Sequence, residues 1–125
     1  MEIKPRYAKA YFLRGGGWLK KADYDHAIAD YTKAIEIDPR YSRVYVNRGN
    51  AYLKKDHYDQ AIADYTKAIE LNPRDAKATF NRAIAYYFRR EYKKAWDDVH
   101  KAQNLGYQVA PRFLKKLRKA SGRQR

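Results

Sequence analysis

A repeat of 34 residues constrains the fold of this chain more than any other feature of its sequence. The stretch that begins at Tyr24 recurs almost unchanged from Tyr58 to Arg74, an offset of 34 residues. A fixed period between 20 and 50 residues is typical of stacked structural units. The sequence therefore predicts an array of similar units, with three copies over residues 8–41, 42–75 and 76–109.

Each unit carries two helical patterns in succession. In the second copy, Tyr58, Ala61, Ile62 and Tyr65 place apolar side chains three or four residues apart, which is helical spacing. A proline such as Pro73 then ends the pattern, because it cannot continue a helix. We expect antiparallel neighbours, since the connections are short. The predicted helices cover residues 7–20, 24–37, 42–54, 58–71, 76–88, 92–104 and 110–120.

Seven landmark positions recur in the units, and small residues alternate there with large ones. In the second unit they are Tyr45, Gly49, Tyr52, Ala61, Tyr65, Ala68 and Pro73. The first unit has Tyr11, Gly15, Trp18, Ala27, Tyr31, Ala34 and Pro39. The pattern resembles the tetratricopeptide repeat (TPR) family, and the third unit departs from it at Thr79, Val99 and Tyr107. The resemblance implies an all-α fold: a right-handed α-solenoid of antiparallel helical hairpins, forming one TPR-like domain over residues 1–125.

The end of such an array needs a cap, because the last unit has no neighbour to cover its apolar face. Gly106 can close the last hairpin, and Pro111 suits the first turn of a further helix. We expect a capping helix over residues 110–120, followed by a basic tail at 121–125. The apolar face of the capping region comprises Val109, Phe113, Leu114 and Leu117.

An arginine and an aspartate recur with the repeat. The arginine lies on the first helix of each unit and the aspartate on the second, so we predict one pair per unit, namely Arg14–Asp30, Arg48–Asp64 and Arg82–Asp98. The alternative is a ladder of free arginines that binds phosphates. The matching period of the acids favours the pairs.

Three consecutive glycines, Gly15 to Gly17, lie inside the first predicted helix, where each one weakens it. Gly15 falls on a small landmark position of the family. Gly16 and Gly17 do not, and they indicate either a frayed helix at the end of the array or a hinge.

The chain contains no motif for catalysis or for a cofactor. It has no cysteine, its three histidines fall at different repeat positions, and it lacks a nucleophile elbow and a phosphate-binding loop. We therefore expect a protein that is not an enzyme and that needs no metal or cofactor. A signal peptide and a long apolar stretch are also missing, so a cytoplasmic location without membrane insertion is the default expectation.

The family resemblance implies a concave groove lined by the first helix of each unit. Carried over by position, this gives a predicted peptide-binding groove with an apolar floor, side-chain amides and a basic rim, comprising Lys9, Phe12, Arg43, Val46, Asn47, Asn50, Lys54, Lys77, Phe80, Asn81 and Ile84. Leu19 and Leu53 belong to the same floor. The alternative for Phe12, Val46 and Phe80 is packing between helices.

The groove and the charge predict different partners. The groove favours a peptide with apolar and acidic side chains. Some family members clamp a C-terminal carboxylate, but this chain keeps only Asn47 and Lys77 of the residues needed for that clamp. The 28 Lys and Arg against 14 Asp and Glu leave a net charge of +14, so nucleic acid or another polyanion is a secondary candidate. A third possibility is a self-assembling or engineered repeat scaffold. For the oligomeric state, we expect a monomer or weak self-association.

Overall fold

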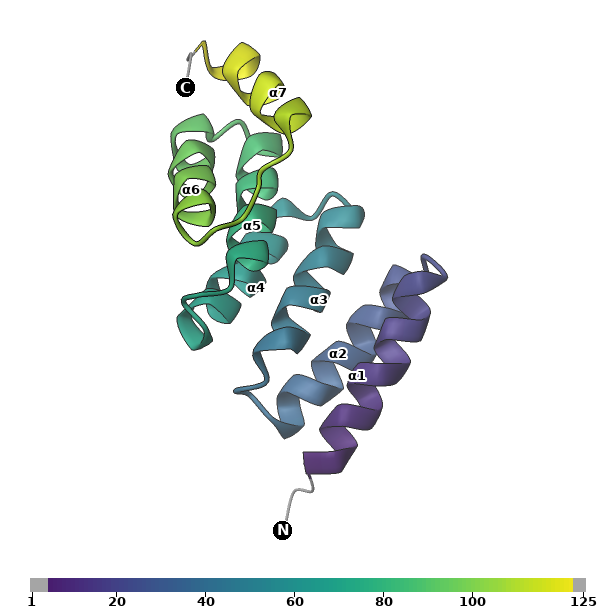
Figure 1. Ribbon diagram of the computed structural model, residues 1–125. Coiled ribbons are helices and arrows are strands. Elements are labelled where there is room, and N and C mark those ends of the chain that lie inside the picture. The colour runs from purple at the N-terminus through teal and green to yellow at the C-terminus, as the bar shows by residue number, and fades with distance from the viewer. Residues whose placement is uncertain (1–4, 123–125) are drawn as a thin grey trace.

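Seven helices and short connections make up the computed structural model, which describes residues 5–122 (Figure 1). The first helix begins two residues before its predicted start, because proline is well tolerated in a first turn. The capping helix lies one residue later than predicted. Residues 123–125 of the predicted basic tail lie outside the described residues. The helices are α1 (Pro5–Lys20), α2 (Tyr24–Ile37), α3 (Ser42–Lys54), α4 (Tyr58–Leu71), α5 (Ala76–Phe88), α6 (Tyr92–Asn104) and α7 (Pro111–Ser121).

The helices form three antiparallel hairpins that stack in chain order. α1 packs on α2, α3 on α4 and α5 on α6, and each second helix also packs on the first helix of the next hairpin. The first helices α1, α3 and α5 approach one another more closely than the second helices do. The array therefore curves with its first helices on the inner side, and α1 and α7 lie at opposite ends (Figure 1).

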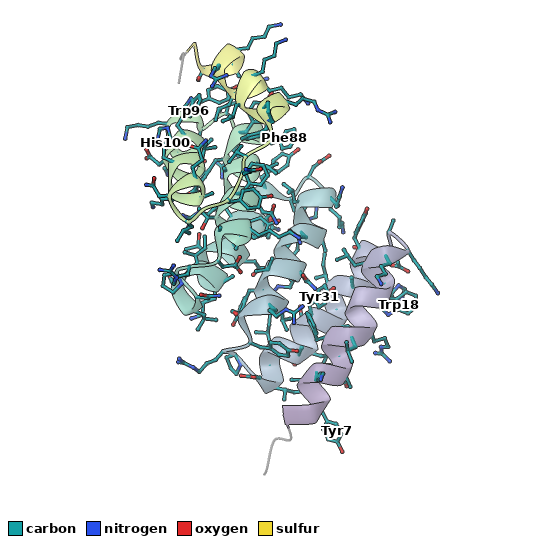
Figure 2. All side chains as sticks on the ribbon, viewed as in Figure 1. Tyr7, Trp18, Tyr31, Phe88, Trp96 and His100 are labelled. Carbon is teal, nitrogen blue, oxygen red and sulfur yellow. The ribbon has the colours of Figure 1, made fainter. Side chains whose placement is uncertain are left out.

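Two glycines allow the helices of the first two hairpins to approach closely. A Cβ atom at Gly15 would lie 2.6 Å from a ring carbon of Tyr31, and one at Gly49 would lie 2.8 Å from the matching carbon of Tyr65. Both tyrosine side chains are fully buried, and Tyr31 is labelled in Figure 2. Each tyrosine ring occupies the space that the Cβ atom of any other residue at the glycine position would need. The close packing of the ring therefore requires a glycine there.

The predicted Arg–Asp pairs form in all three hairpins. In each pair, two guanidinium nitrogens donate to the two carboxylate oxygens at 2.7–2.8 Å. Arg48 and Arg82 also donate to Thr32 and Thr66 of the preceding hairpin, both at 3.1 Å. The pairs therefore join hairpins to one another as well as closing each one. Hydrogen bonding to Asp64 raises the pKa of Arg48.

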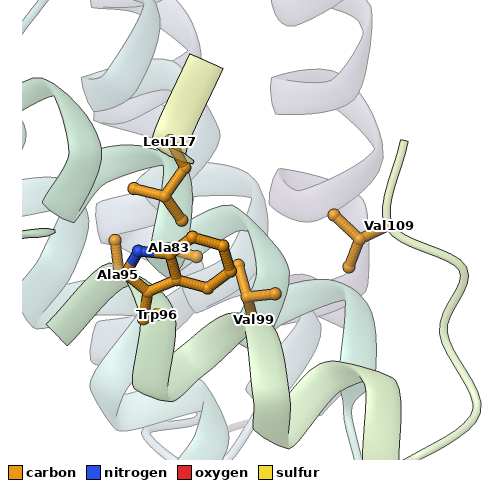
Figure 3. Packing of buried hydrophobic residues seen from close by; sticks show 6 residues of the cluster. All are labelled: Ala83, Ala95, Trp96, Val99, Val109 and Leu117. Carbon is orange, nitrogen blue, oxygen red and sulfur yellow. The ribbon is translucent and has the colours of Figure 1, made fainter. Parts of the chain in front are cut away.

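Helix α7 caps the last hairpin as predicted. Leu117 of α7 and Val109, which precedes it, join Ala83, Ala95, Trp96 and Val99 in one buried cluster (Figure 3). The Trp96 indole N–H donates to Ser121 at 3.0 Å, which fixes the far end of the helix. Gly106 has the expected positive φ of 93°. The basic side chains of α7, from Arg112 to Lys119, are exposed.

The turn between the two helices of each hairpin contains a non-glycine residue with a positive φ, which the sequence does not predict. Ala22, Asp56 and Arg90 occupy equivalent positions and share a φ of 59–63°, in the left-handed region. Non-glycine residues adopt this conformation at some energetic expense. Identical turns thus arise from three different side chains, because hairpin packing fixes the backbone.

Removing one member of an Arg–Asp pair should be costly. We expect Asp64→Ala to lower the free energy of unfolding by about 3 kcal/mol, because it leaves the guanidinium of Arg48 buried without its carboxylate. The exposed Asp97→Ala is the matched control and should change stability by less than about 1 kcal/mol. The double variant Arg48→Leu/Asp64→Ala should recover most of the loss. Urea denaturation measures all three, and equal stability of Asp64→Ala and Asp97→Ala would contradict the interpretation.

The glycine contacts give a second prediction, of opposite sign at two sites. Gly49→Ala should lower stability by about 1–3 kcal/mol, because the buried Tyr65 ring has no room to move aside. Gly17→Ala should raise it by about 0.5–1 kcal/mol, since nothing lies within 4 Å of the added Cβ and alanine favours the helix. Thermal unfolding followed by circular dichroism separates the two outcomes. A stabilised Gly49→Ala variant would show that the close approach is not required.

Candidate functional site

The predicted groove residues lie on the three first helices, on the inner side of the array. A hollow of about 350 Å³ opens among them, and it is the place where predicted residues gather most clearly. Asn50, Lys54 and Asn81 line it together with three further side chains. Leu19 and Leu53 supply the expected apolar wall, whereas Tyr24, at the start of α2, was not predicted to take part.

Asn50 is the centre of the polar contacts in this hollow. Its carboxamide oxygen accepts the Tyr65 hydroxyl proton at 2.5 Å and an amide N–H of Asn81 at 3.1 Å. Within the described residues, the Asn50 amide group and the Asn81 carbonyl oxygen make no further hydrogen bond. These groups are a donor and an acceptor on neighbouring helices, as the backbone of an extended peptide requires.

The basic residues expected at the rim of the groove lie at the surface. Lys9, Arg43, Lys54 and Lys77 are all exposed, and they come from α1, α3 and α5. Arg43 lies over the ring of Phe12, with its guanidinium carbon 5.4 Å from the ring centroid. Cations at the edge of an apolar hollow favour ligands with acidic groups.

Two residues that we expected to form an open apolar floor are packed instead. Phe12 is only 9% exposed, and its ring lies 6.2 Å from that of Tyr31 and 5.1 Å from that of Tyr41. Phe80 meets Tyr107 and Phe113 at 5.1 and 5.3 Å. The position on the helix was interpreted correctly. The next element covers each ring: the turn before α3 covers Phe12, and the cap covers Phe80.

Three other predicted residues lie between core and surface. Val46 is half-buried and packs against buried residues of the second hairpin. Ile84 and Asn47 are also half-buried. Asn47 lies close to the hydroxyl of Tyr31: burial raises the pKa of that hydroxyl, and the Asn47 amide opposes the rise. Within the described residues, however, the buried Tyr31 hydroxyl has no hydrogen-bond partner of acceptable geometry.

A second hollow, of about 490 Å³, lies away from the groove at the first end of the array. Tyr7, Ala10, Tyr11, Arg14 and Ile37 line it. This is the face of the first hairpin to which no other hairpin of the described residues is docked. Accordingly, the Arg14 side chain is 66% exposed, against 19% for Arg48.

The structure also bears on a metal site and on a membrane-spanning helix. Within residues 5–122, no group of three or more histidine or acidic side chains could hold a metal ion. None of the described helices combines the length and the apolar character needed to cross a bilayer.

Comparison with known proteins places these features in context. Sequence models described as tetratricopeptide repeat match residues 42–75 and 64–97, and one described as TPR repeat matches residues 19–56. No curated protein sequence matches the chain.

Solved structures give a close match over the whole array. The TPR2B domain of yeast Sti1, in a complex with pHsp70, has a TM-score of 0.83 and 30% identity, over 96% of this chain and 99% of that one. The second TPR domain of human RPAP3, in complex with the HSP70 peptide SGPTIEEVD, has a TM-score of 0.84 and 30% identity, over 94% and 98%. The first TPR of Spaghetti (RPAP3), bound to the HSP90 peptide SRMEEVD, has a TM-score of 0.87 and 26% identity, over 98% and 96%.

The contact between Asn50 and Tyr65 predicts that Asn50 supports the hollow as well as lining it. Asn50→Ala should lower the free energy of unfolding by about 1–3 kcal/mol, because the buried Tyr65 hydroxyl loses its acceptor. Adding Tyr65→Phe should restore part of this loss, since the stranded hydroxyl is then removed. Chemical denaturation of the single and double variants provides the measurement. A double variant less stable than Asn50→Ala alone would contradict this role.

Proposed function

The chain belongs to the tetratricopeptide repeat family, and from this membership we propose that it is a non-catalytic interaction module that binds a peptide segment of a partner protein. The peptide lies along the inner side of the array, across α1, α3 and α5. One observation carries the proposal: the hollow that brings Asn50, Asn81 and Lys54 together with an apolar wall. A pocket with an apolar lining and a few fixed polar groups is typical of binding sites.

The chemistry of this hollow defines the segment that fits it. The wall of Leu19, Leu53 and the Tyr24 ring accepts one apolar side chain of the peptide. The side-chain NH2 group of Asn50 and the side-chain carbonyl oxygen of Asn81 bind the backbone of the peptide. Lys54 at the edge, with the other rim cations, attracts acidic side chains on either side of the apolar one.

The peptides bound by the similar domains support a peptide ligand but leave its sequence open. The yeast Sti1 domain is in a complex with pHsp70, and the human RPAP3 domain is in complex with the HSP70 peptide SGPTIEEVD. Family members that clamp a C-terminal carboxylate need a lysine where this chain has Phe12, an asparagine where it has Gly16 and a basic residue where it has Asn81. We therefore propose an internal segment with apolar and acidic side chains as the ligand, in place of a clamped chain end.

Polyanion binding is the alternative, and the exposed basic side chains of α7 favour it. Such binding weakens steeply with salt, because each phosphate contact releases counterions. Single-stranded RNA also stacks on exposed aromatic side chains. In this chain Tyr31, Tyr45 and Tyr65 are buried, and the exposed aromatic side chains Tyr7 and Phe88 lie on α1 and α5, not on the basic α7. We therefore rank the peptide above nucleic acid.

Two charge reversals distinguish these functions. Lys54 lines the hollow, whereas Lys67 is exposed on α4, a second helix. Proteins recovered from a nuclease-treated lysate should be lost with Lys54→Glu and retained with Lys67→Glu, because only Lys54 borders the groove. The loss should amount to about tenfold in affinity for a recovered partner, as expected for one close charge pair plus repulsion.

The matched variants also test the alternative directly. Both substitutions change the net charge by the same amount. If Lys54→Glu and Lys67→Glu weaken recovery equally, and nuclease abolishes it, then the basic surface and not the groove is the binding site.

A further inference from the structure

The contacts around Asn50 provide a template for a second polar site, one repeat earlier. Asn50 offers one carboxamide oxygen to two donors: the Tyr65 hydroxyl and the Asn81 amide. The residues 34 positions earlier than these two donors are Tyr31 and Asn47, which are chemically identical to them. The residue 34 positions before Asn50 is Gly16. Both donors are therefore present one repeat earlier, Tyr31 on α2 and Asn47 on α3, but the acceptor is missing.

The three hairpins differ in the residues that they carry at the Asn50 position of the first helix and at the Tyr65 position of the second helix. In the second hairpin Asn50 on the first helix accompanies Tyr65 on the second, and both are polar there. In the third hairpin Ile84 accompanies Val99, and both are apolar. Only in the first hairpin, where Gly16 accompanies Tyr31, does a hydroxyl face a position without a side chain.

The surroundings of Gly16 show where a missing acceptor would enter. A Cβ atom added at Gly16 would have a single neighbour within 4 Å, the Tyr31 hydroxyl oxygen at 4.0 Å. Gly16 itself is only half-buried. The Tyr31 side chain is fully buried, and its hydroxyl has no hydrogen-bond partner within the described residues. A buried hydroxyl without a partner is unfavourable, so an acceptor delivered to it is strongly preferred.

We propose that Gly16 opens a subsite on the groove in which the carboxamide oxygen of an asparagine or glutamine side chain of the bound peptide accepts hydrogen bonds from Tyr31 and Asn47. This assignment rests on the proposed function and specifies part of the ligand. The peptide side chain takes the place that the Asn50 side chain occupies in the next hairpin. It makes the two hydrogen bonds that Asn50 makes with Tyr65 and Asn81.

The template favours a carboxamide over a carboxylate. The carboxamide of Asn50 is uncharged, and burying an ionised group without a paired cation is far more costly than burying an amide. Asp30 acts on the Tyr31 hydroxyl, and Arg14 already pairs with Asp30 through two hydrogen bonds. Arg14 is therefore not available to pair with a carboxylate of the ligand.

Access to the hydroxyl depends on the side chain of Asn47. Asn81 is held by its hydrogen bond to Asn50, but within the described residues Asn47 has no such bond to a residue at the Gly16 position. Because the Tyr31 hydroxyl is buried and Asn47 lies beside it, the proposed binding requires Asn47 to turn about its side-chain torsions and direct its amide toward the ligand.

The test compares Gly16→Asn with Gly17→Asn. Both replace a helical glycine by the same residue, and neither added Cβ meets any atom closer than 4.0 Å, so both variants should fold. Gly16→Asn supplies the acceptor from the chain itself and fills the subsite. Gly17→Asn leaves the subsite open. Gly16→Asn should therefore melt at a higher temperature than Gly17→Asn.

Ligand binding is measured by titrating acetamide and following the Asn47 side-chain amide by nuclear magnetic resonance. Wild type and Gly17→Asn should show saturable shifts, and Gly16→Asn should bind at least about tenfold more weakly, since two hydrogen bonds are blocked. Acetate should produce smaller shifts than acetamide. Equal binding of acetamide by the two variants would overturn the subsite, and stronger binding of acetate would overturn the choice of a carboxamide.

The outcome is separable from that of the proposed function. If Gly16→Asn retains partners that Lys54→Glu loses, and acetamide does not perturb Asn47, then the groove binds peptides and the subsite is wrong. If acetamide binds as expected while the Lys54→Glu and Lys67→Glu variants recover the same proteins, the subsite stands and the proposed groove function fails.

Discussion

The close approach of a tyrosine on the second helix to a glycine on the first sets the geometry of the first two hairpins. Tyr31 and Tyr65 can be buried only because Gly15 and Gly49 have no Cβ atom. The same contact carries each tyrosine hydroxyl through the hairpin to the inner side of the array. There it meets Asn50 in one hairpin and the position of Gly16 in the other. A packing constraint thus determines where polar groups are available to a ligand.

The Arg–Asp pairs contribute to the uniqueness of this packing more than to its net stability. Burial raises the pKa of Asp64 more than Arg48 lowers it, so much of the favourable energy of the pair is offset by desolvation. The bidentate geometry nevertheless fixes the register of the two helices, and the threonine of the preceding hairpin fixes the next unit. Arg14, which has no preceding hairpin to contact in the described residues, is accordingly the most exposed of the three arginines.

The sequence predicted the fold well because a repeat tests each assignment several times. The helix boundaries and the ion pairs follow from spacing alone, and each signal recurs after 34 residues. The groove was harder to predict. Spacing shows which face of a helix Phe12 and Phe80 occupy, but not that Tyr41 or the cap covers them. The positive φ of Ala22 could not be predicted from the sequence either, because hairpin packing imposes this conformation on a residue that does not favour it. The role of Tyr24 depends on the start of α2 reaching the hollow, which only the three-dimensional arrangement reveals.

Comparison of the two nearly identical units distinguishes the residues that hold the hairpins together from those that vary on the inner side of the array. The residues they share include the arginine, the aspartate, the small landmark glycine and the buried tyrosine, and all of these hold the hairpins together. The units differ mainly on the first helix, at positions that face the groove. There Gly16 corresponds to Asn50, and Leu13 corresponds to Asn47. The exchange of Asn50 for Gly16 removes one polar contact of the hairpin, the acceptor of the tyrosine hydroxyl, but it keeps the glycine–tyrosine packing and the ion pair. The positions at which the repeats disagree therefore change the polar groups that each unit presents on the inner side of the array.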